Sequence, residues 1–327
     1  MAIIGSELNY YQAKVNNDTA SNGGRISTTI IPSGLKHFMW PSISEAQLIA
    51  GATQWRKGFV RIDNAANEVA AKLRIGLWRP TPGSDRLSLA KGTQTNIQSS
   101  FGSPDLYGCG KLDLSVTTGG NTIKVLVEDG TVILFRNGGL IRISDETTLG
   151  NGGNAEVHTI AGIPSVTGDV VTLTIAGTLA HDYSSANTYV SSLIEESNVA
   201  GTTSGNVVIS AAGTFNANLM EVGNLGSIYQ TLTFTFATAT TFTCTSDEGV
   251  LLPGGTTGNT YAPTHVSVGA SYCSVPPACW GGVYAPGDTV TITTIPPCVP
   301  VLEKRVVPAG SPAIATQERV LMFFVES

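Results

Sequence analysis

Side chains that could do acid–base chemistry are few in this chain, and their spacing separates them. Adjacent acids occur at three places, Asp145-Glu146, Glu195-Glu196 and Asp247-Glu248. Neighbouring residues on a strand point to opposite faces of a sheet, so none of these pairs presents the two facing carboxylates of a glycosidase. Pairing of acids distant in sequence stays open. Because acids beside turns are usually solvated, we interpret the three pairs as solvated turn residues.

Two histidine-containing segments offer the next candidates. Glu156 and His158 share a strand face at i, i+2, and His181-Asp182 precedes Tyr183, so either segment could begin a metal or acid–base site. Two residues do not complete one. The motifs H-E-x-x-H, G-x-S-x-G and the Walker phosphate loop do not occur, and the glycine-rich segment 150–155 precedes no helix that could bind an anion. We therefore predict no catalytic, cofactor-binding or metal-ligating residues, and a protein that is not an enzyme.

Cysteines and tryptophans are better explained as structural residues. The five cysteines are Cys109, Cys244, Cys273, Cys279 and Cys298. Their odd number and their lack of C-x₂₋₄-C pairs favour buried thiols over disulfides or zinc ligands. The tryptophans Trp40, Trp55, Trp78 and Trp280 could stack on sugars or anchor a core or interface, and the missing carboxylate pair favours anchoring.

The overall composition excludes several classes of partner. The 327 residues carry a net charge of −6 with 13% charged residues, which argues against the clustered lysines and arginines that bind nucleic acid. No apolar stretch approaches the roughly 18–20 residues that span a bilayer, and the first eight residues lack the pattern of a signal peptide. We expect no nucleic-acid partner, no membrane partner and no export signal.

Hydrophobic periodicity predicts an all-β fold. Leu73, Ile75 and Leu77 alternate with polar neighbours, and hairpin signals such as Asp129-Gly130 and Asn137-Gly-Gly139 separate short apolar runs, among them 132–135. Threonines fill one face of 231–236, a pattern typical of an exposed or partner-contacting sheet. A single helix is predicted over 42–50, with Ser42 or Ser44 as N-cap and Gly51 at its end.

Turn-rich stretches divide the chain into two or three β-sandwich or small-barrel domains. We predict an extended N-terminal arm over 1–30, part of a sandwich over 31–105, a small barrel or sandwich over 106–195, and a further sandwich over 196–327. The terminal strand 320–325 suits pairing with the first domain. In an alternative arrangement, 31–105 and 196–327 complete one composite domain into which the middle domain is inserted.

Several turn and strand-edge motifs carry a family resemblance. They are Asn22-Gly-Gly-Arg25, Trp55-Arg-Lys-Gly-Phe59, Arg79-Pro-Thr-Pro-Gly83, Phe135-Arg-Asn-Gly-Gly-Leu-Ile-Arg-Ile-Ser-Asp145, Gly281-Gly-Val-Tyr-Ala-Pro-Gly-Asp288 and Lys304-Arg-Val-Val-Pro-Ala-Gly310. In this order they resemble virion structural proteins of tailed bacteriophages, at neck, collar or tail positions of Mu-like and contractile-tailed phages. The resemblance spans most of the chain but includes no reactive group.

The resemblance implies a neck or collar protein at the head–tail junction. Such a protein assembles in the host cytoplasm, becomes part of the virion, and forms a homo-oligomer that also contacts other neck and tail proteins. The arm 1–30 and the threonine-rich strands are the expected contacts with neighbours. The alternative is a tail-fibre or baseplate-associated protein that uses loops 251–264 and 271–286 to bind a glycan on the host surface.

Overall fold

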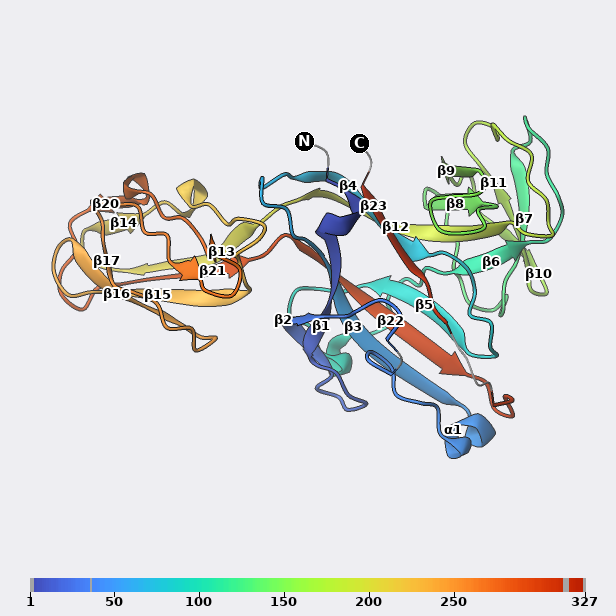
Figure 1. Ribbon diagram of the computed structural model, residues 1–327, viewed down its shortest axis with the longest axis horizontal. Coiled ribbons are helices and arrows are strands. Elements are labelled where there is room, and N and C mark those ends of the chain that lie inside the picture. Colours follow the sequence, from blue (N-terminus) through green and yellow to red (C-terminus); the bar gives the residue numbers. More distant parts are fainter. Residues whose placement is uncertain (1–2, 36, 314–317, 326–327) are drawn as a thin grey trace.

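The protein is built almost entirely of antiparallel β-sheet, arranged in several domains, as the sequence predicts. The computed structural model describes residues 3–35, 37–313 and 318–325. Figure 1 shows three lobes: a central lobe that holds both chain termini, a green lobe on one side and a yellow-to-orange lobe on the other. We name the green lobe the first insert (residues 108–193) and the yellow-to-orange lobe the second insert (residues 200–297).

The central lobe contains a five-stranded sheet made from both ends of the chain. Its order is β2-β1-β3-β22-β5. The strands are β1 (Leu8–Val15), β2 (Gly23–Ile30), β3 (Ala52–Ile62), β5 (Arg86–Lys91) and β22 (Cys298–Val307). β22 lies between β3 and β5, and its register with β3 runs from Cys298 opposite Arg61 to Val307 opposite Ala52. The C-terminal part of the chain thus supplies an interior strand of the N-terminal sheet.

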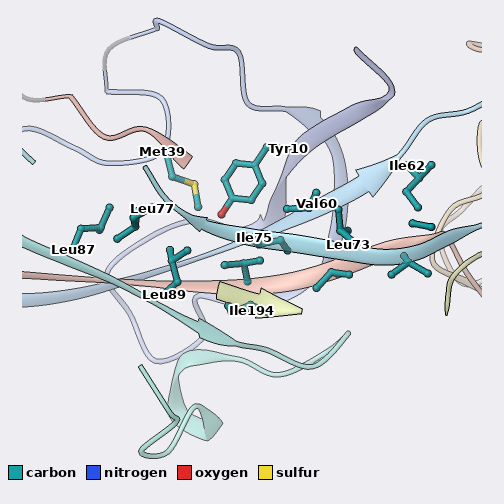
Figure 2. Close-up of a cluster of buried hydrophobic side chains, with 14 of the residues drawn as sticks. Tyr10, Met39, Val60, Ile62, Leu73, Ile75, Leu77, Leu87, Leu89 and Ile194 are labelled. Carbon is teal, nitrogen blue, oxygen red and sulfur yellow. The ribbon is translucent and has the colours of Figure 1, made fainter. Parts of the chain in front are cut away.

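A second layer closes the central lobe. Here β4 (Ala70–Leu77) pairs on one side with β23 (Leu321–Val325) and on the other with the second half of β12 (Tyr189–Val199). Leu73, Ile75 and Leu77 point into the core, as their alternation predicts. Figure 2 shows them facing Val60 and Leu89 of the first layer. Burial of these apolar side chains between two sheets is the main source of the lobe's stability.

The ring of Tyr10 in β1 needs a glycine in the neighbouring strand β3. The ring lies over Gly58 of β3, where a Cβ atom would stand only 2.2 Å from the ring carbon Cζ. The same ring contacts Phe323 of β23, with centroids 5.5 Å apart. A residue in the first strand therefore touches the last strand of the chain, and the glycine in β3 makes that contact possible.

The first insert is a compact β-domain with its own core. Its strands are β6 (Cys109–Leu112), β7 (Thr122–Leu126), β8 (Leu140–Ser144), β9 (Ala155–Thr159), β10 (Ser165–Thr167) and β11 (Val170–Thr174), completed by the first half of β12. β12 belongs to both lobes, so one sheet continues from the insert into the central lobe. Residues 132–135 form no strand, because Asp129 holds Thr131 and Val132 in a turn, although Phe135 is buried.

The second insert is a sheet covered on one face by loops. The sheet has the order β13-β21-β15-β16-β17. Its strands are β13 (Thr202–Ile209), β15 (Gln230–Phe236), β16 (Thr241–Ser246), β17 (Gly255–Thr256) and β21 (Thr289–Ile295). The covering segments include the pairs β14 (Gly213–Phe215) with β20 (Trp280–Gly282) and β18 (Thr264–His265) with β19 (Ala270–Ser271). Aromatic side chains dominate the core between the two layers.

Helices are short. α1 (Glu45–Ala50) begins after Ser44, whose hydroxyl accepts from the N–H of Gln47 at 3.3 Å, and it ends before Gly51 with a φ of 78°, so this predicted helix is confirmed. The 3₁₀ turns are Gly5–Glu7, Gln98–Ser100, Ala217–Leu219 and Pro277–Cys279. Across the described ranges, no helix is long and apolar enough to cross a membrane.

Two predictions about the ends of the chain are corrected. Residues 1–30 do not form an extended arm over their described part: β1 pairs with both β2 and β3, and Tyr10, Tyr11 and Ala13 are buried. Residues 196–327 do not form one sandwich either. β22 and β23 join the N-terminal strands, as the composite arrangement predicts, whereas 202–295 build a separate sheet and core.

Candidate functional site

The candidate acids of the sequence are mostly engaged within the chain. Glu146 pairs with Arg142 at 2.6 Å, Glu195 with Arg74 at 2.8 Å and Glu196 with Lys91 at 2.7 Å. Asp247 and Glu248 both contact Arg25, at 2.6 and 3.2 Å. Their interpretation as merely solvated turn residues is therefore wrong for five of the six acids, which form ion pairs. The pairs of Glu195, Glu196, Asp247 and Glu248 join segments distant in sequence, which no local pattern could predict.

Glu156 and His158 do meet, as their shared strand face predicts. His158 Nε2 lies 2.9 Å from Glu156 Oε2, and the same carboxylate accepts from the N–H groups of Ala180 and His181 and from the hydroxyl of Tyr183. Burial opposes ionisation of Glu156, but these donors outweigh it, so its pKa lies below its ordinary value. The carboxylate is a saturated acceptor that ties β9 to the turn before Tyr183.

The remaining candidate, Asp182, has a local role. Its carboxylate accepts from the N–H of Thr118 at 2.7 Å and from the Thr118 hydroxyl at 3.0 Å. These backbone and side-chain bonds lower the pKa of Asp182. Among the described residues, no group of three or more histidine, cysteine, aspartate and glutamate side chains is placed to hold a metal ion.

The thiols are buried and unpaired, which confirms their assignment to the core. All five cysteines are free. Burial raises the pKa of Cys109, Cys273 and Cys298 to about 12 and that of Cys244 to about 11. Because the thiolate is the reactive form, these residues have the character of inert core side chains.

Tryptophan positions also favour anchoring. Trp40 and Trp78 are buried, Trp55 packs edge-on against Phe101, and Trp280 lies among the rings of the second insert with Phe215 4.7 Å away. The tyrosines of the two loops named for glycan binding, Tyr261, Tyr272 and Tyr284, are buried as well.

A buried polar cluster in the central lobe is centred on Glu303. This β22 side chain is fully buried and accepts hydrogen bonds from the Tyr10 hydroxyl at 2.7 Å, Trp40 Nε1 at 3.0 Å and Arg319 Nη1 at 2.6 Å. The three donors come from β1, from the loop before α1 and from the segment before β23. One carboxylate therefore connects four separate parts of the chain. Burial and the adjacent Glu303 charge raise the pKa of Tyr10 well above its ordinary value.

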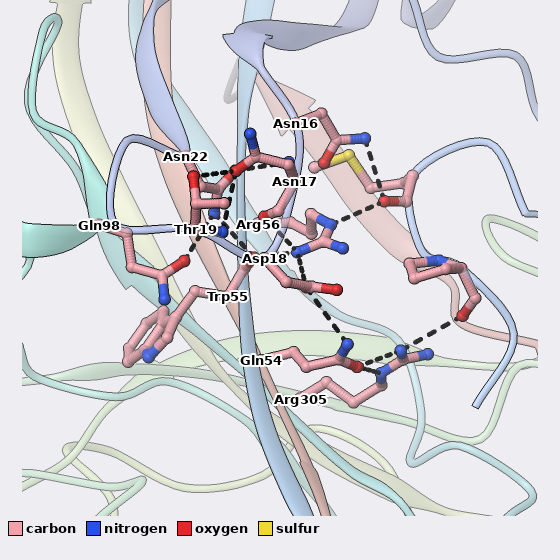
Figure 3. Close-up of polar contacts among 12 residues, drawn as sticks. Asn16, Asn17, Asp18, Thr19, Asn22, Gln54, Trp55, Arg56, Gln98 and Arg305 are labelled. Carbon is pink, nitrogen blue, oxygen red and sulfur yellow. Dashed lines mark hydrogen bonds and ion pairs between the residues drawn. The ribbon is translucent and has the colours of Figure 1, made fainter. Parts of the chain in front are cut away.

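Two arginines extend this cluster, as Figure 3 shows in part. The guanidinium groups of Arg56 and Arg305 lie 5.0 and 4.6 Å from the Trp40 ring. Arg56 donates to Met39 O at 3.1 Å and to Asp18 Oδ1 at 2.7 Å, and Arg305 donates to Gln54 Oε1 at 3.1 Å from its Nε. Burial lowers the pKa of Arg305. Each charge is neutralised or solvated by protein groups, which is the condition for burying it.

Two of the motifs that carried the family resemblance meet beside this cluster. Asn22 is fully buried and donates to Trp55 O at 2.9 Å and to Gln98 Oε1 at 3.0 Å. Lys57 donates to Gly24 O at 2.6 Å and to Asn96 O at 3.0 Å, and burial lowers its pKa to about 7. The motifs 22–25 and 55–59 are thus contacting parts of one structural unit.

Contacts between lobes form a second group of functional candidates. Arg61 donates to Asn224 O at 2.7 Å and Leu225 O at 2.9 Å, and Asn224 in turn donates to Asn67 Oδ1 at 2.8 Å. Lys14 and Arg25 of the central lobe pair with the acids at 247–248 of the second insert. These bonds restrain the second insert against the central lobe.

The first insert is joined to the central lobe in a similar way. Arg86 pairs with Asp129, and Arg136 contacts Asp105 at 3.1 Å and donates to Leu106 O at 2.7 Å. Burial, with the nearby Asp85 charge, raises the pKa of Glu128 to about 7, and Arg86 opposes that shift. This junction therefore contains a carboxyl group that titrates near neutrality.

Two small hollows lie at these junctions. One, of about 210 Å³, is lined by Tyr107, Leu134 and Arg136, and the other, of about 300 Å³, by Gln94, Val199 and Pro296. Small-molecule sites usually measure about 300–1,000 Å³ and combine apolar walls with convergent polar groups. Neither of these two hollows is lined by Glu303 or by Glu156.

Comparison of the chain with protein-family models, with curated proteins and with solved structures found no match in any of the three. What the chain itself offers is its geometry, together with the sequence motifs that carry the resemblance. Its candidate polar side chains are engaged in internal contacts. Its central lobe is built from both ends of the chain, and two β-domains are inserted into that lobe.

Removing the Glu303 carboxylate should lower the stability of the central lobe. Glu303→Ala leaves Arg319 and Trp40 Nε1 without their acceptor inside the core, a change that costs about 3–5 kcal/mol. Urea unfolding followed by tryptophan fluorescence measures this loss, since three of the four tryptophans lie in the central lobe. The matched control Glu196→Ala, whose carboxylate is partly exposed, should change stability by no more than about 0.5 kcal/mol. Equal effects of the two variants would contradict the role given to Glu303.

The Glu128 junction should make stability depend on pH in a defined direction. The folded carboxyl retains its proton to about pH 7, whereas the unfolded one ionises near 4.5. Between these values the folded state binds more protons, so the free energy of unfolding falls as pH rises. Glu128→Gln removes that loss and should be more stable than wild type at pH 8 by about 1–2 kcal/mol, after allowance for partial exposure. Thermal unfolding at pH 8 and pH 4.5 tests this. The same difference at both pH values would contradict it.

Proposed function

We propose that this chain is a structural subunit of a tailed-phage virion, placed at the neck or collar, that acts by assembling with copies of itself and with other virion proteins. The observation that carries the proposal is the commitment of its chemically capable side chains to internal structure. Glu303, Glu156 and the acid pairs hold strands and lobes together, and the thiols lie in the cores. A protein that uses its polar side chains in this way is suited to act through its shape and its contacts with other proteins.

The assignment to a phage particle, and to its neck or collar, is based on the sequence resemblance. Its motifs 22–25 and 55–59 build the contact region of the central lobe, and 304–310 includes the end of β22. These motifs form contacts that hold the central lobe together. A rigid subunit of this kind is suited to a fixed place in an assembly. The multi-lobed form, with each insert restrained by ion pairs and backbone acceptors, suits a subunit that must present several surfaces at set angles.

The fibre or baseplate alternative receives less support from the site. It needs exposed aromatic side chains in the loops 251–264 and 271–286, and the tyrosines there are buried. Leu251 is 96% exposed in the first of these loops, but an isolated aliphatic side chain offers no stacking surface for a sugar.

Locating the chain in the particle tests the proposal. Cryo-electron microscopy of phage particles that encode this chain, with antibody labelling of the loop that contains the exposed residues 258–260, should place it as a ring at the head–tail junction. Label at the tail tip or fibres would support host recognition instead. Absence of the chain from purified particles, measured by mass spectrometry, would overturn the virion assignment altogether.

A further inference from the structure

The tripeptide Asn-Gly-Gly occurs three times in this chain, at 22–24, 137–139 and 151–153. An asparagine followed by glycine is prone to lose its side-chain amide, because glycine has no side chain to hinder attack of its backbone nitrogen on the asparagine Cγ. Since the three tripeptides are identical, the surrounding fold decides which of them reacts.

The first copy is held inside the central lobe. Asn22 is fully buried, and its Nδ2 donates to Trp55 O at 2.9 Å and to Gln98 Oε1 at 3.0 Å, as Figure 3 shows. Two acceptors therefore hold the nitrogen that would have to leave. Burial also keeps water away from the carboxamide. We expect Asn22 to keep its amide in the folded protein.

The second copy is exposed, but its reacting groups are engaged elsewhere. Asn137 and Gly138 lie in the turn before β8, and both are exposed. The Gly138 N–H donates to Ile160 O at 2.9 Å. Asn137 Oδ1 accepts from the Gly162 N–H at 2.8 Å. Because the backbone nitrogen and the carboxamide have different partners, attack of one on the other requires both bonds to break.

The third copy has the opposite arrangement. Asn151 and Gly152 are exposed in the loop between β8 and β9. The Gly152 N–H donates to the neighbouring side chain itself, with its nitrogen 2.8 Å from Asn151 Oδ1. This oxygen is bonded to Cγ, so the nitrogen already lies beside the carbon that it would attack, a proximity that favours intramolecular reactions. Within the described part of the chain, no hydrogen bond holds Asn151 Nδ2.

The turn maintains this arrangement. The Asn151 N–H donates to Thr148 O at 2.9 Å, and the Thr148 N–H donates to Asn151 O at 3.3 Å. Gly152 has a φ of 74°, and a Cβ atom there would stand 2.2 Å from Thr147 Oγ1. The turn therefore requires glycine at 152, the same residue whose small size permits the attack.

We infer that Asn151 deamidates spontaneously in the folded protein. The Gly152 nitrogen gives up its proton to solvent and forms a bond to Asn151 Cγ. The Cγ–Nδ2 bond then breaks, and the amide leaves as ammonia after taking a proton from solvent. Water opens the resulting succinimide at either carbonyl carbon, which gives aspartate or isoaspartate. The net reaction consumes one water and releases one ammonia, and it needs no other reactant.

The product adds a carboxylate to a loop that already contains two. Asp145 Oδ1 accepts from the Asn154 N–H at 2.6 Å, and Glu146 Oε2 accepts from the Gly150 N–H at 3.1 Å. A third negative charge in this loop repels the other two. Isoaspartate also lengthens the main chain by one carbon at a tight turn. Deamidation therefore loosens the loop and makes the surface of the first insert more negative as the protein ages.

Mass spectrometry after incubation of the full-length protein at mildly alkaline pH tests the inference. Digestion after glutamate places Asn151 in the peptide 147–156 and Asn137 in the peptide 129–146. In the folded protein we expect Asn151 to convert at least about tenfold faster than Asn137 or Asn22, with isoaspartate among its products. In urea, which frees all three tripeptides from their contacts, we expect the three rates to become similar.

Two variants serve as controls, after circular dichroism has shown that each is folded. Asn151→Asp provides the reference for the aspartate product. Asn151→Gln keeps an amide whose longer side chain closes a ring far more slowly, so the mass change of the peptide 147–156 should disappear. An Asn151 that keeps its amide in the folded protein, or that reacts no faster there than the equally exposed Asn137, would overturn the inference.

Discussion

The insertion of β22 between β3 and β5 is the constraint on which the rest of the structure depends. Ten residue pairs join β22 to β3 and six join it to β5, so the N-terminal sheet lacks an interior strand until the chain returns from both inserts. Closing so long a loop costs conformational entropy. The hydrogen bonds of β22 with its two neighbouring strands and the burial of Val301 and Leu302 offset this cost. The interior position of β22 also places Glu303 and Arg305 within reach of the other segments of the central lobe, with which both side chains form contacts.

This arrangement determines how the inserts are held. The first insert shares β12 with the central lobe, and the second leaves at Val199 and returns at Cys298, so each insert is attached at both of its ends. Ion pairs such as Arg25 with Asp247 then add restraint at the surface. Attachment at both ends therefore holds each insert in one orientation relative to the central lobe.

Local sequence signals predicted only part of this structure. Features that depend only on neighbouring residues can be predicted from the sequence. Examples are the cap at Ser44, the glycine at 51 and the alternation of Leu73, Ile75 and Leu77. The first strand was missed because the Asn- and Gly-rich turn after it indicates an exposed arm. The β-favouring pair Tyr10-Tyr11 was the signal that could have found it.

The polar cluster could not be predicted from local pattern. Arg56, Lys57 and Glu303 look like surface residues of exposed strands, and they are buried because their partners come from distant segments. The return of β22 to the first sheet is likewise a non-local pairing, so hairpin signals assigned it to the wrong domain. The threonine alternation, by contrast, correctly indicated an outer sheet face.

Native-state hydrogen exchange can show whether the two ends of the chain form one cooperative domain. We expect the amides of β3 and β22, for example Val60 and Val301, to be among the most protected of the central lobe and to lose protection together as denaturant is added. If β22 exchanges freely while β3 stays protected, the C-terminal strand is only a loosely attached element, and the composite domain is not the foundation of the fold.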